Sequence, residues 1–156
     1  MVNLLFVCLG NICRSPTAEG IFKKLLKDKD LSEKIFVDSA GTSSWHNGDP
    51  PDVRAQKTAK KYKIDLSTIR SRSLVTEDFN RFNYIIAMDT NNFQGILEKC
   101  PPTRTGRLFM LLSFAPQLNT IDIPDPYYHD SFDEVFKMIE IASEGLLEKI
   151  GKDLNF

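Results

Sequence analysis

The sequence contains little cysteine and histidine, and this excludes several classes of site. Its 156 residues include three cysteines and two histidines. A small and odd number of cysteines does not fit the disulfide framework of a secreted domain. The two histidines, His46 and His129, have no metal-ligand spacing to each other or to the cysteines. We therefore expect neither a disulfide scaffold nor a zinc site.

The sequence also has no large excess of charge of one sign and no long apolar run. The 20 Lys and Arg residues are matched by 21 Asp and Glu residues, and the net charge is −1. Such a chain lacks the bulk field that nonspecific nucleic-acid or membrane-surface binding requires, so any anion site must be local. The N-terminus has no basic segment, and the apolar run Leu4 to Val7 is too short for a signal peptide or a membrane span. We expect a cytoplasmic protein that binds no nucleic acid and spans no membrane.

The composition is that of an ordinary globular protein, with 42% hydrophobic and 26% charged residues. This excludes a disordered, collagen-like or coiled-coil chain. A length of 156 residues supports one domain. We therefore predict a single domain over residues 1–156.

Short apolar runs alternate with helical patterns along the chain. This β-α-β alternation predicts an α/β fold with a mainly parallel sheet and helices on both faces, in which ligands bind at the carboxyl ends of the strands. The loop after the first strand is therefore the expected site. We predict strands at 3–8, 34–38, 84–88 and 107–112. We also predict a helix that starts at Pro16, and further helices at 52–62, 91–99 and 131–150.

The loop after the first strand carries the pattern Cys-x5-Arg-Ser, from Cys8 to Ser15. Gly10 and Asn11 tolerate positive φ, so the backbone can curl and turn successive N–H groups inward as an anion nest. Arg14 can place a planar fork on two phosphate oxygens. With Ser15 as the N-cap and a proline at the first helical position, a helix would begin directly below the loop. The pattern predicts a phosphate-binding loop.

The same loop favours a reactive cysteine. A thiol at a helix N-terminus beside an arginine commonly has a pKa of ~3.5–7.5, so Cys8 is expected to be a thiolate, the nucleophilic form. The Ser15 hydroxyl can donate a hydrogen bond to that sulfur. The alternative is that Cys8 is a small buried hydrophobe and Arg14 a surface cation.

The segment from Val7 to Pro16 resembles the signature of the low-molecular-weight protein tyrosine phosphatases. Other landmarks of that family appear in order at Asp38–Thr42, Trp45, Pro51–Arg54, Ala87–Asp89 and Asp125–Tyr128. The resemblance implies a four-stranded parallel sheet with flanking helices. It also implies hydrolysis of tyrosine-phosphorylated proteins, and of small aryl phosphates, through a phosphocysteine on Cys8, with no metal or other cofactor and with phosphate or other oxyanions as inhibitors.

Phosphotyrosine hydrolysis also requires an acid, because a phenolate leaves poorly unless it is protonated. By resemblance to the family's Asp-Pro-Tyr-Tyr element, Asp125 is the general acid and then the base for the attacking water. It stands in a long loop from Ser113 to Asp130, and loops of that length are usually functional. A plain turn at Asp125 is the alternative, and Asp89 or Asp122 would then be the next candidates for the acid.

Substrate binding is expected from the loop and from three aromatic residues. Trp45, Tyr127 and Tyr128 are expected to wall a slot for a flat phenyl ring, too deep for phosphoserine. The alternatives are core packing for Trp45 and ordinary loop packing for the two tyrosines. Besides these three, the residues expected to bind substrate are Leu9, Gly10, Asn11, Ile12, Cys13 and Ser15.

Cys13 follows the nucleophile by five residues. A neighbouring thiol can trap a sulfenic acid on Cys8 as a disulfide, although Cys13 can equally be a loop-packing residue. Relatives often carry a histidine that helps to tie the loop to the serine matching Ser39, and Ile69 stands in its place here. We expect Asn11 and Ser39 to hold the loop through a shorter set of hydrogen bonds.

Three rival functions remain open. An arsenate reductase would need a further cysteine pair, and only Cys100 is left for it. The family's protein-arginine phosphatases tend to have threonine where Ile12 stands, which favours an aromatic substrate here. A noncatalytic phosphotyrosine-binding module could lose the nucleophile or the acid, whereas this chain has Cys8, Arg14 and Asp125 together.

Overall fold

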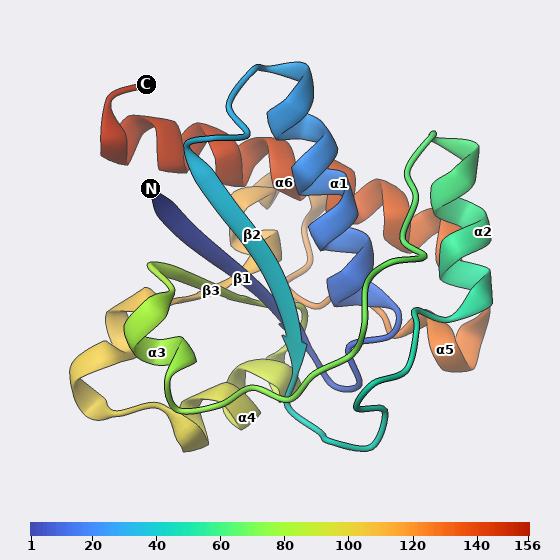
Figure 1. The fold of residues 1–156 in the computed structure, drawn as a ribbon, viewed down its shortest axis with the longest axis horizontal. Coiled ribbons are helices and arrows are strands. Elements are labelled where there is room, and N and C mark those ends of the chain that lie inside the picture. The colour runs from blue at the N-terminus through green and yellow to red at the C-terminus, as the bar shows by residue number, and fades with distance from the viewer.

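The computed structural model describes all 156 residues and contains one sheet of four parallel strands in the order β2-β1-β3-β4. The predicted α/β class and the parallel four-stranded sheet are confirmed, and helices cover both faces (Figure 1). The strands are β1 (Val2–Cys8), β2 (Ile35–Gly41), β3 (Tyr84–Ala87) and β4 (Leu108–Met110). The helices are α1 (Arg14–Asp28), α2 (Val53–Lys61), α3 (Asp78–Arg81), α4 (Thr90–Lys99), α5 (Pro126–His129) and α6 (Phe132–Leu154), with 3₁₀ helices at Pro102–Arg107, Leu111–Phe114 and Pro116–Leu118.

Strand β1 lies inside the sheet, and its continuous apolar run follows from that position. Leu4 and Phe6 pack toward α1 and α6 in the larger core cluster. Leu5 and Val7 point to the other face, into a smaller cluster that includes side chains of α3 and α4. All four of these β1 side chains are fully buried.

Helix α6 presents the predicted apolar stripe to the core. It begins one residue after the predicted start and runs four residues beyond Ile150. Tyr62, which follows α2, stacks on Phe136 of this helix with ring centroids 4.3 Å apart. Every residue predicted for the stripe is buried: Phe132, Val135, Phe136, Ile139, Ala142, Leu146 and Ile150.

Three element boundaries differ from prediction, two of them for identifiable reasons. Helix α1 begins at Arg14, with Cys13 as its N-cap, so the predicted cap at Ser15 is wrong; the Ser15 hydroxyl is directed to Cys8 instead. Strand β4 stops at Met110 rather than residue 112, because the chain tightens into a 3₁₀ turn at Leu111. Strand β2 continues to Gly41, three residues beyond its predicted end.

The predicted long loop from Ser113 to Asp130 is also partly helical. It contains a 3₁₀ turn and the four-residue helix α5, and the Asp125 side chain caps α5 by accepting from the Tyr127 N–H. Helix α3 was not predicted, since four residues carry no readable periodicity. Asp125 therefore lies at a helix start instead of in open loop.

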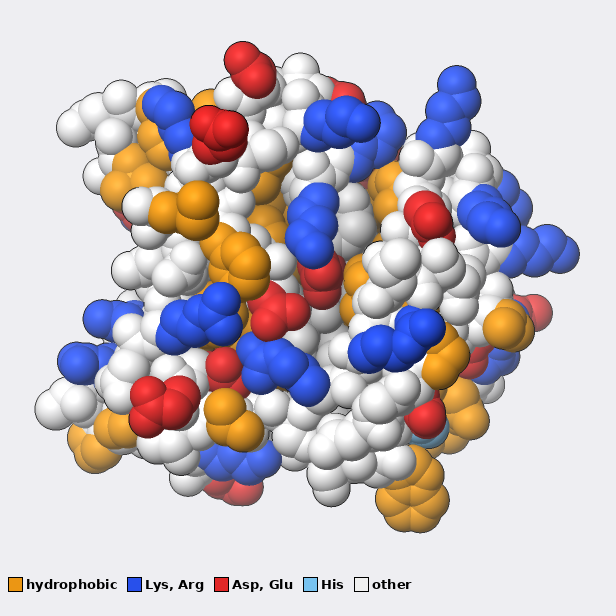
Figure 2. All heavy atoms as spheres, in the orientation of Figure 1, with side chains coloured by type: hydrophobic (Ala, Val, Ile, Leu, Met, Phe, Trp, Pro, Cys, Tyr) orange, Lys and Arg blue, Asp and Glu red, His pale blue; other side chains and the backbone are white.

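The carboxyl ends of β1 and β2 lie side by side, with Cys8 opposite Gly41. A Cβ atom at Gly41 would stand 2.8 Å from the Leu9 carbonyl oxygen, so only glycine lets β2 approach the loop this closely. Acidic and basic side chains are interspersed over the face drawn in Figure 2. No helix combines the length and the apolar character needed to cross a membrane.

Candidate active site

The loop after β1 curls around one left-handed residue. Of the two residues that tolerate positive φ, Asn11 adopts it, with φ 56°, and Gly10 does not. A Cβ atom at position 10 would lie 3.0 Å from the His46 ring, a contact that would require this side chain to shift.

The carbonyl groups of this loop are engaged by its neighbours. The Cys8 oxygen accepts from Thr42 N–H and the Leu9 oxygen from Ser43 N–H, each at 3.0 Å. Similar bonds hold the Gly10, Ile12 and Cys13 oxygens, from Ser71 Oγ, Asp52 N–H and Thr17 N–H. Because these carbonyls are turned to the surrounding segments, the N–H groups of the loop other than that of Asn11, which donates to Cys8 Sγ, are left for an anion.

Cys8 is buried, with 3% of its surface exposed, but its sulfur has polar partners. The Asn11 N–H donates to Sγ at 3.3 Å, and the Ser15 Oγ lies 3.0 Å away. A backbone N–H and a hydroxyl group therefore converge on this sulfur. This is not the environment of an inert apolar cysteine.

Arg14 is buried rather than a surface cation, with 2% exposed. Its Nη1 donates to Asp89 Oδ2 at 2.6 Å and to the Ile123 carbonyl at 2.8 Å. Burial lowers the pKa of Arg14, but Cys8, Asp89 and Asp125 together outweigh it and raise that pKa above its ordinary value. Arg14 is a permanently charged group held beside the sulfur.

Asp125, the residue that caps α5, lies beside Arg14. Its Oδ2 lies 3.6 Å from Arg14 Nη2, and its side chain is 29% exposed. The other two acids considered are engaged elsewhere: Asp89 holds Arg14, and Asp122 accepts from the N–H and hydroxyl of Thr90. Of the three, Asp125 alone lines the cavity above Cys8.

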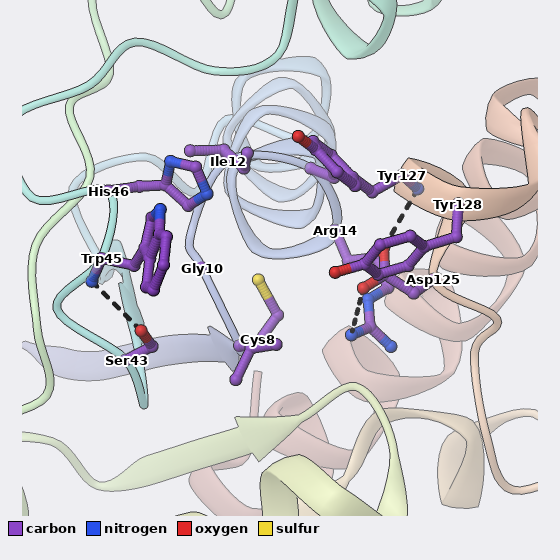
Figure 3. Close-up of a pocket in the computed structure, with 12 residues that line it drawn as sticks. Cys8, Gly10, Ile12, Arg14, Ser43, Trp45, His46, Asp125, Tyr127 and Tyr128 are labelled. Carbon is purple, nitrogen blue, oxygen red and sulfur yellow. Dashed lines mark hydrogen bonds and ion pairs between the residues drawn. The ribbon is translucent and has the colours of Figure 1, made fainter.

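That cavity has a volume of about 350 Å³, within the range of small-molecule sites. Trp45 stands on one side of Cys8, and Tyr127 and Tyr128 stand on the other (Figure 3). Trp45 is 87% exposed, so the alternative of core packing is wrong. The two tyrosine rings meet edge to face with centroids 5.0 Å apart, and Arg54 lies over the Tyr127 ring.

The predicted binding residues divide into two groups. Leu9, Gly10, Ile12 and Cys13 line the cavity, whereas Asn11 and Ser15 are fully buried behind the loop. Sequence reasoning missed two further lining residues, Ser43 and His46. They lie in the polar segment after β2, where no motif distinguishes them.

Cys13 lines the cavity with Cys8 and is also buried, in a small cluster with Ala55 and Phe132. All three cysteines are free thiols. Burial, reinforced by the nearby Asp52 charge, raises the pKa of the Cys13 thiol well above its usual range. Cys13 is therefore held as a thiol.

The hydrogen bonds expected to hold the loop are present. Asn11 Nδ2 donates to Ser39 Oγ at 3.0 Å and to Ser15 Oγ at 2.7 Å. Ile69, in place of the histidine expected from relatives, packs against the larger core cluster. No group of three or more His, Cys, Asp and Glu side chains is arranged to hold a metal ion.

Comparison with known proteins shows similarity over the whole chain. The family model described as low molecular weight phosphotyrosine protein phosphatase matches residues 3–155. The low molecular weight protein-tyrosine-phosphatase YfkJ of Bacillus subtilis is 40% identical to this chain over 153 residues, which are 98% of each chain. The crystal structure of YfkJ superposes with a TM-score of 0.95, over 98% of this chain and 96% of that one. A protein tyrosine phosphatase from Entamoeba histolytica, solved with Hepes in the active site, has 41% identity and a TM-score of 0.94 over 98% of this chain and 99% of that one.

Proposed function

This chain belongs to the low molecular weight phosphotyrosine protein phosphatase family, and we propose that it hydrolyses phosphotyrosine through a phosphocysteine on Cys8. Arg14 binds the phosphoryl group, and Asp125 is the general acid and base. The observation that supports this most directly is that these three side chains line one cavity at the end of β1.

In the first step the Cys8 thiolate attacks phosphorus, and the bond from phosphorus to the phenolic oxygen breaks. The carboxylic acid of Asp125 gives its proton to that oxygen, so a phenol leaves. The loop N–H groups and the guanidinium of Arg14 bind the equatorial oxygens, where negative charge is concentrated. Asp89 fixes Arg14 at Nη1, which leaves the rest of the fork for the phosphoryl group.

In the second step water attacks the phosphorus of the phosphocysteine. Asp125, now a carboxylate, takes a proton from that water, and the sulfur–phosphorus bond breaks. The Ser15 hydroxyl, 3.0 Å from Sγ, stabilises the departing thiolate. Inorganic phosphate leaves, and both Cys8 and Asp125 return to their starting states.

The walls of the cavity support an aryl substrate. A phenyl ring can stack between Trp45 and the two tyrosines, whereas phosphoserine has no ring to contact them. Ile12 adds an apolar contact to the cavity lining, which favours phosphotyrosine over phosphoarginine. We propose tyrosine-phosphorylated proteins as substrates and tetrahedral oxyanions as inhibitors. A thiol nucleophile functions only when reduced, which agrees with a cytoplasmic location.

The test is hydrolysis of a phosphotyrosine peptide and of p-nitrophenyl phosphate in EDTA. The wild type should hydrolyse both, and a phosphoenzyme captured by acid quench should map to Cys8. Cys8→Ser should lose several orders of magnitude in turnover, because a serine hydroxyl does not replace the thiolate. Cys100→Ser is the matched control, since Cys100 lies outside the cavity.

Substantial turnover by Cys8→Ser would remove Cys8 as the nucleophile. Binding of phosphotyrosine without hydrolysis by the wild type would indicate a recognition module. Preferential hydrolysis of phosphoarginine peptides would instead show that Ile12 does not select the aromatic substrate.

A further inference from the structure

One motif seen in the sequence, Pro51–Arg54, plays no part in the mechanism above. Its last residue, Arg54, lies in α2 and does not line the cavity. Two of the Arg54 nitrogens face one carboxylate, with Nε 3.0 Å from Asp52 Oδ1 and Nη2 2.9 Å from Asp52 Oδ2. A guanidinium held at two points has a fixed plane.

Asp52 is itself fixed to the loop that surrounds the anion site. Its backbone N–H donates to the Ile12 carbonyl oxygen at 2.8 Å. Its Oδ1 also accepts from the Arg54 backbone N–H and so caps α2. The Arg54 guanidinium is therefore anchored both to the loop and to the start of α2.

From this anchor the guanidinium extends to α5. Its Cζ lies 5.3 Å from the centre of the Tyr127 ring and 4.8 Å from the centre of the Phe132 ring, both within cation–π distance. The remaining nitrogen, Nη1, is 3.4 Å from the Tyr127 carbonyl oxygen, which makes a long hydrogen bond. Arg54 thus contacts Tyr127 through both its ring and its backbone.

Helix α5 needs such a contact to fix its orientation. Of its four residues only Pro126 is buried, and a single buried residue holds a short helix in place but leaves it free to pivot. The ion pair of Asp125 with Arg14, at 3.6 Å, does not prevent this during the reaction. Asp125 is uncharged when it acts as the acid, and Arg14 then faces the phosphoryl group.

Tyr127 connects the contact with Arg54 to the acid. Asp125 Oδ1 accepts from the Tyr127 N–H at 3.1 Å, so the carboxyl group and the Tyr127 backbone move together (Figure 3). The Tyr127 side chain also lines the cavity. A displacement of Tyr127 therefore shifts a wall of the cavity and the acid at the same time.

We propose that Arg54 is a positioning residue that holds α5 against the loop, so that the Tyr127 ring and the Asp125 carboxyl group stay directed into the cavity above Cys8. The inference rests on the proposed role of Asp125 as general acid. Without the guanidinium, α5 is free to pivot about Pro126. The acid then loses its place at the departing oxygen, and proton transfer requires hydrogen-bond distance.

The experiment measures single-turnover phosphorylation of the full chain by aryl phosphates whose leaving groups differ in basicity. Arg54→Met keeps the length and the helix propensity of the side chain but has no guanidinium. We expect a loss of about tenfold with phosphotyrosine and of about twofold or less with p-nitrophenyl phosphate, because only the basic leaving group depends strongly on a well-placed acid. Arg54→Lys, which offers a point charge in place of the fork, should show the same trend and serves if Arg54→Met does not fold.

Loss of Arg54 also leaves the Asp52 charge unpaired near an anion site, and this repulsion must be separated from positioning. The double variant Asp52→Asn/Arg54→Met removes both charges and keeps the net charge of the wild type, and asparagine is an equally good cap for α2. We expect the leaving-group-dependent loss to persist in it. In an Asp125→Ala background, Arg54→Met should add only a factor that is the same for every leaving group, because the acid through which it acts is gone.

The matched control is Lys61→Met. Lys61 also lies in α2 and also pairs with a carboxylate outside that helix, Asp133 of α6, at 3.0 Å, but it does not line the cavity. Because this pair contacts neither α5 nor the loop, the control should match the wild type with every leaving group.

Arg54 variants that lose nothing, or that lose activity equally with all leaving groups, would overturn the proposal. Full recovery in Asp52→Asn/Arg54→Met would do the same, as would a leaving-group dependence that persists undiminished in the Asp125→Ala background. If Asp125→Ala itself shows no leaving-group dependence, the role of Asp125 as acid falls together with the inference. A strong dependence in Asp125→Ala beside unaffected Arg54 variants rejects Arg54 alone.

Discussion

The carboxylate of Asp89 holds the guanidinium of Arg14 from behind, with Oδ2 2.6 Å from Nη1. The other oxygen of Asp89 accepts from Asn92 N–H and caps helix α4. One side chain therefore joins the start of α4 to the group proposed to bind the phosphoryl oxygens. The negative charge of Asp89 offsets the cost of burying the guanidinium, so Arg14 stays charged although it is buried.

Arg14→Lys should lower kcat/KM by at least about 100-fold, because a point charge does not reproduce a planar two-pronged contact. Asp89→Asn retains the cap of α4, since asparagine is an equally good N-cap, and loses only the charged contact to Arg14. We expect about a tenfold loss for Asp89→Asn. Steady-state kinetics with p-nitrophenyl phosphate measure both, and near-normal kinetics in Arg14→Lys would contradict the role assigned to Arg14.

Asp125→Ala should slow the phosphorylation step by roughly 10²–10⁴-fold for phosphotyrosine. The loss should be much smaller for aryl phosphates with acidic leaving groups, because an activated phenolate needs the proton less than one whose conjugate acid has a pKa of about 10. Single-turnover kinetics isolate this step from dephosphorylation. If the ratio of the wild-type to the variant phosphorylation rate is the same for every leaving group, Asp125 only shapes α5.

The three cysteines should differ in reactivity toward iodoacetamide at neutral pH. Burial raises the pKa of the Cys13 and Cys100 thiols, so neither is a thiolate there, whereas Cys8 has converging donors. Peptide mapping should show carbamidomethyl first on Cys8. As pH rises, Cys100 should follow, and Cys13 should react last; rapid labelling of Cys13 at neutral pH would contradict the effect of its burial.

Peroxide should inactivate the enzyme reversibly. A sulfenic acid on Cys8 condenses with the Cys13 thiol, which lines the same cavity, and releases water to form a disulfide that added thiol reduces. Cys13→Ser should make the loss harder to reverse. Mapping that finds Cys8 linked to Cys100, or not linked, would refute this pairing.

Gly41→Ala should damage both stability and activity. The added Cβ meets the Leu9 carbonyl oxygen, part of the backbone that surrounds the anion site. We expect destabilisation of about 1–3 kcal/mol and a raised Kd for phosphate. Gly106→Ala, where a Cβ meets nothing within 4 Å, is the control and should be nearly neutral; equal effects of the two substitutions in denaturant titrations would dismiss the close approach at Gly41.

Much of the architecture could be read from the sequence, because β1 and α6 are long and strongly patterned. The apolar run of β1 and the buried stripe of α6 reflect burial that local periodicity records directly. Among the boundaries that were wrong, those at Ser15 and after Met110 depend on where a hydroxyl or a turn is directed in three dimensions. Local pattern does not carry that information.

The residues of the candidate site also divide into those that local sequence motifs indicate and those that they do not. Cys8 and Arg14 stand in one short motif, and Asp125 stands in another, so each could be named from the sequence. His46 and Ser43 carry no motif and reach the cavity only because β2 ends beside the loop.

The exposure of Trp45 determines what optical methods will report about this protein. It is the only tryptophan in the chain and stands almost fully in water at the mouth of the cavity. Indole emission is therefore a local reporter of ligand stacking at the site. Because the ring is already solvated in the native state, the same emission is a poor monitor of global denaturation, for which circular dichroism is the better signal.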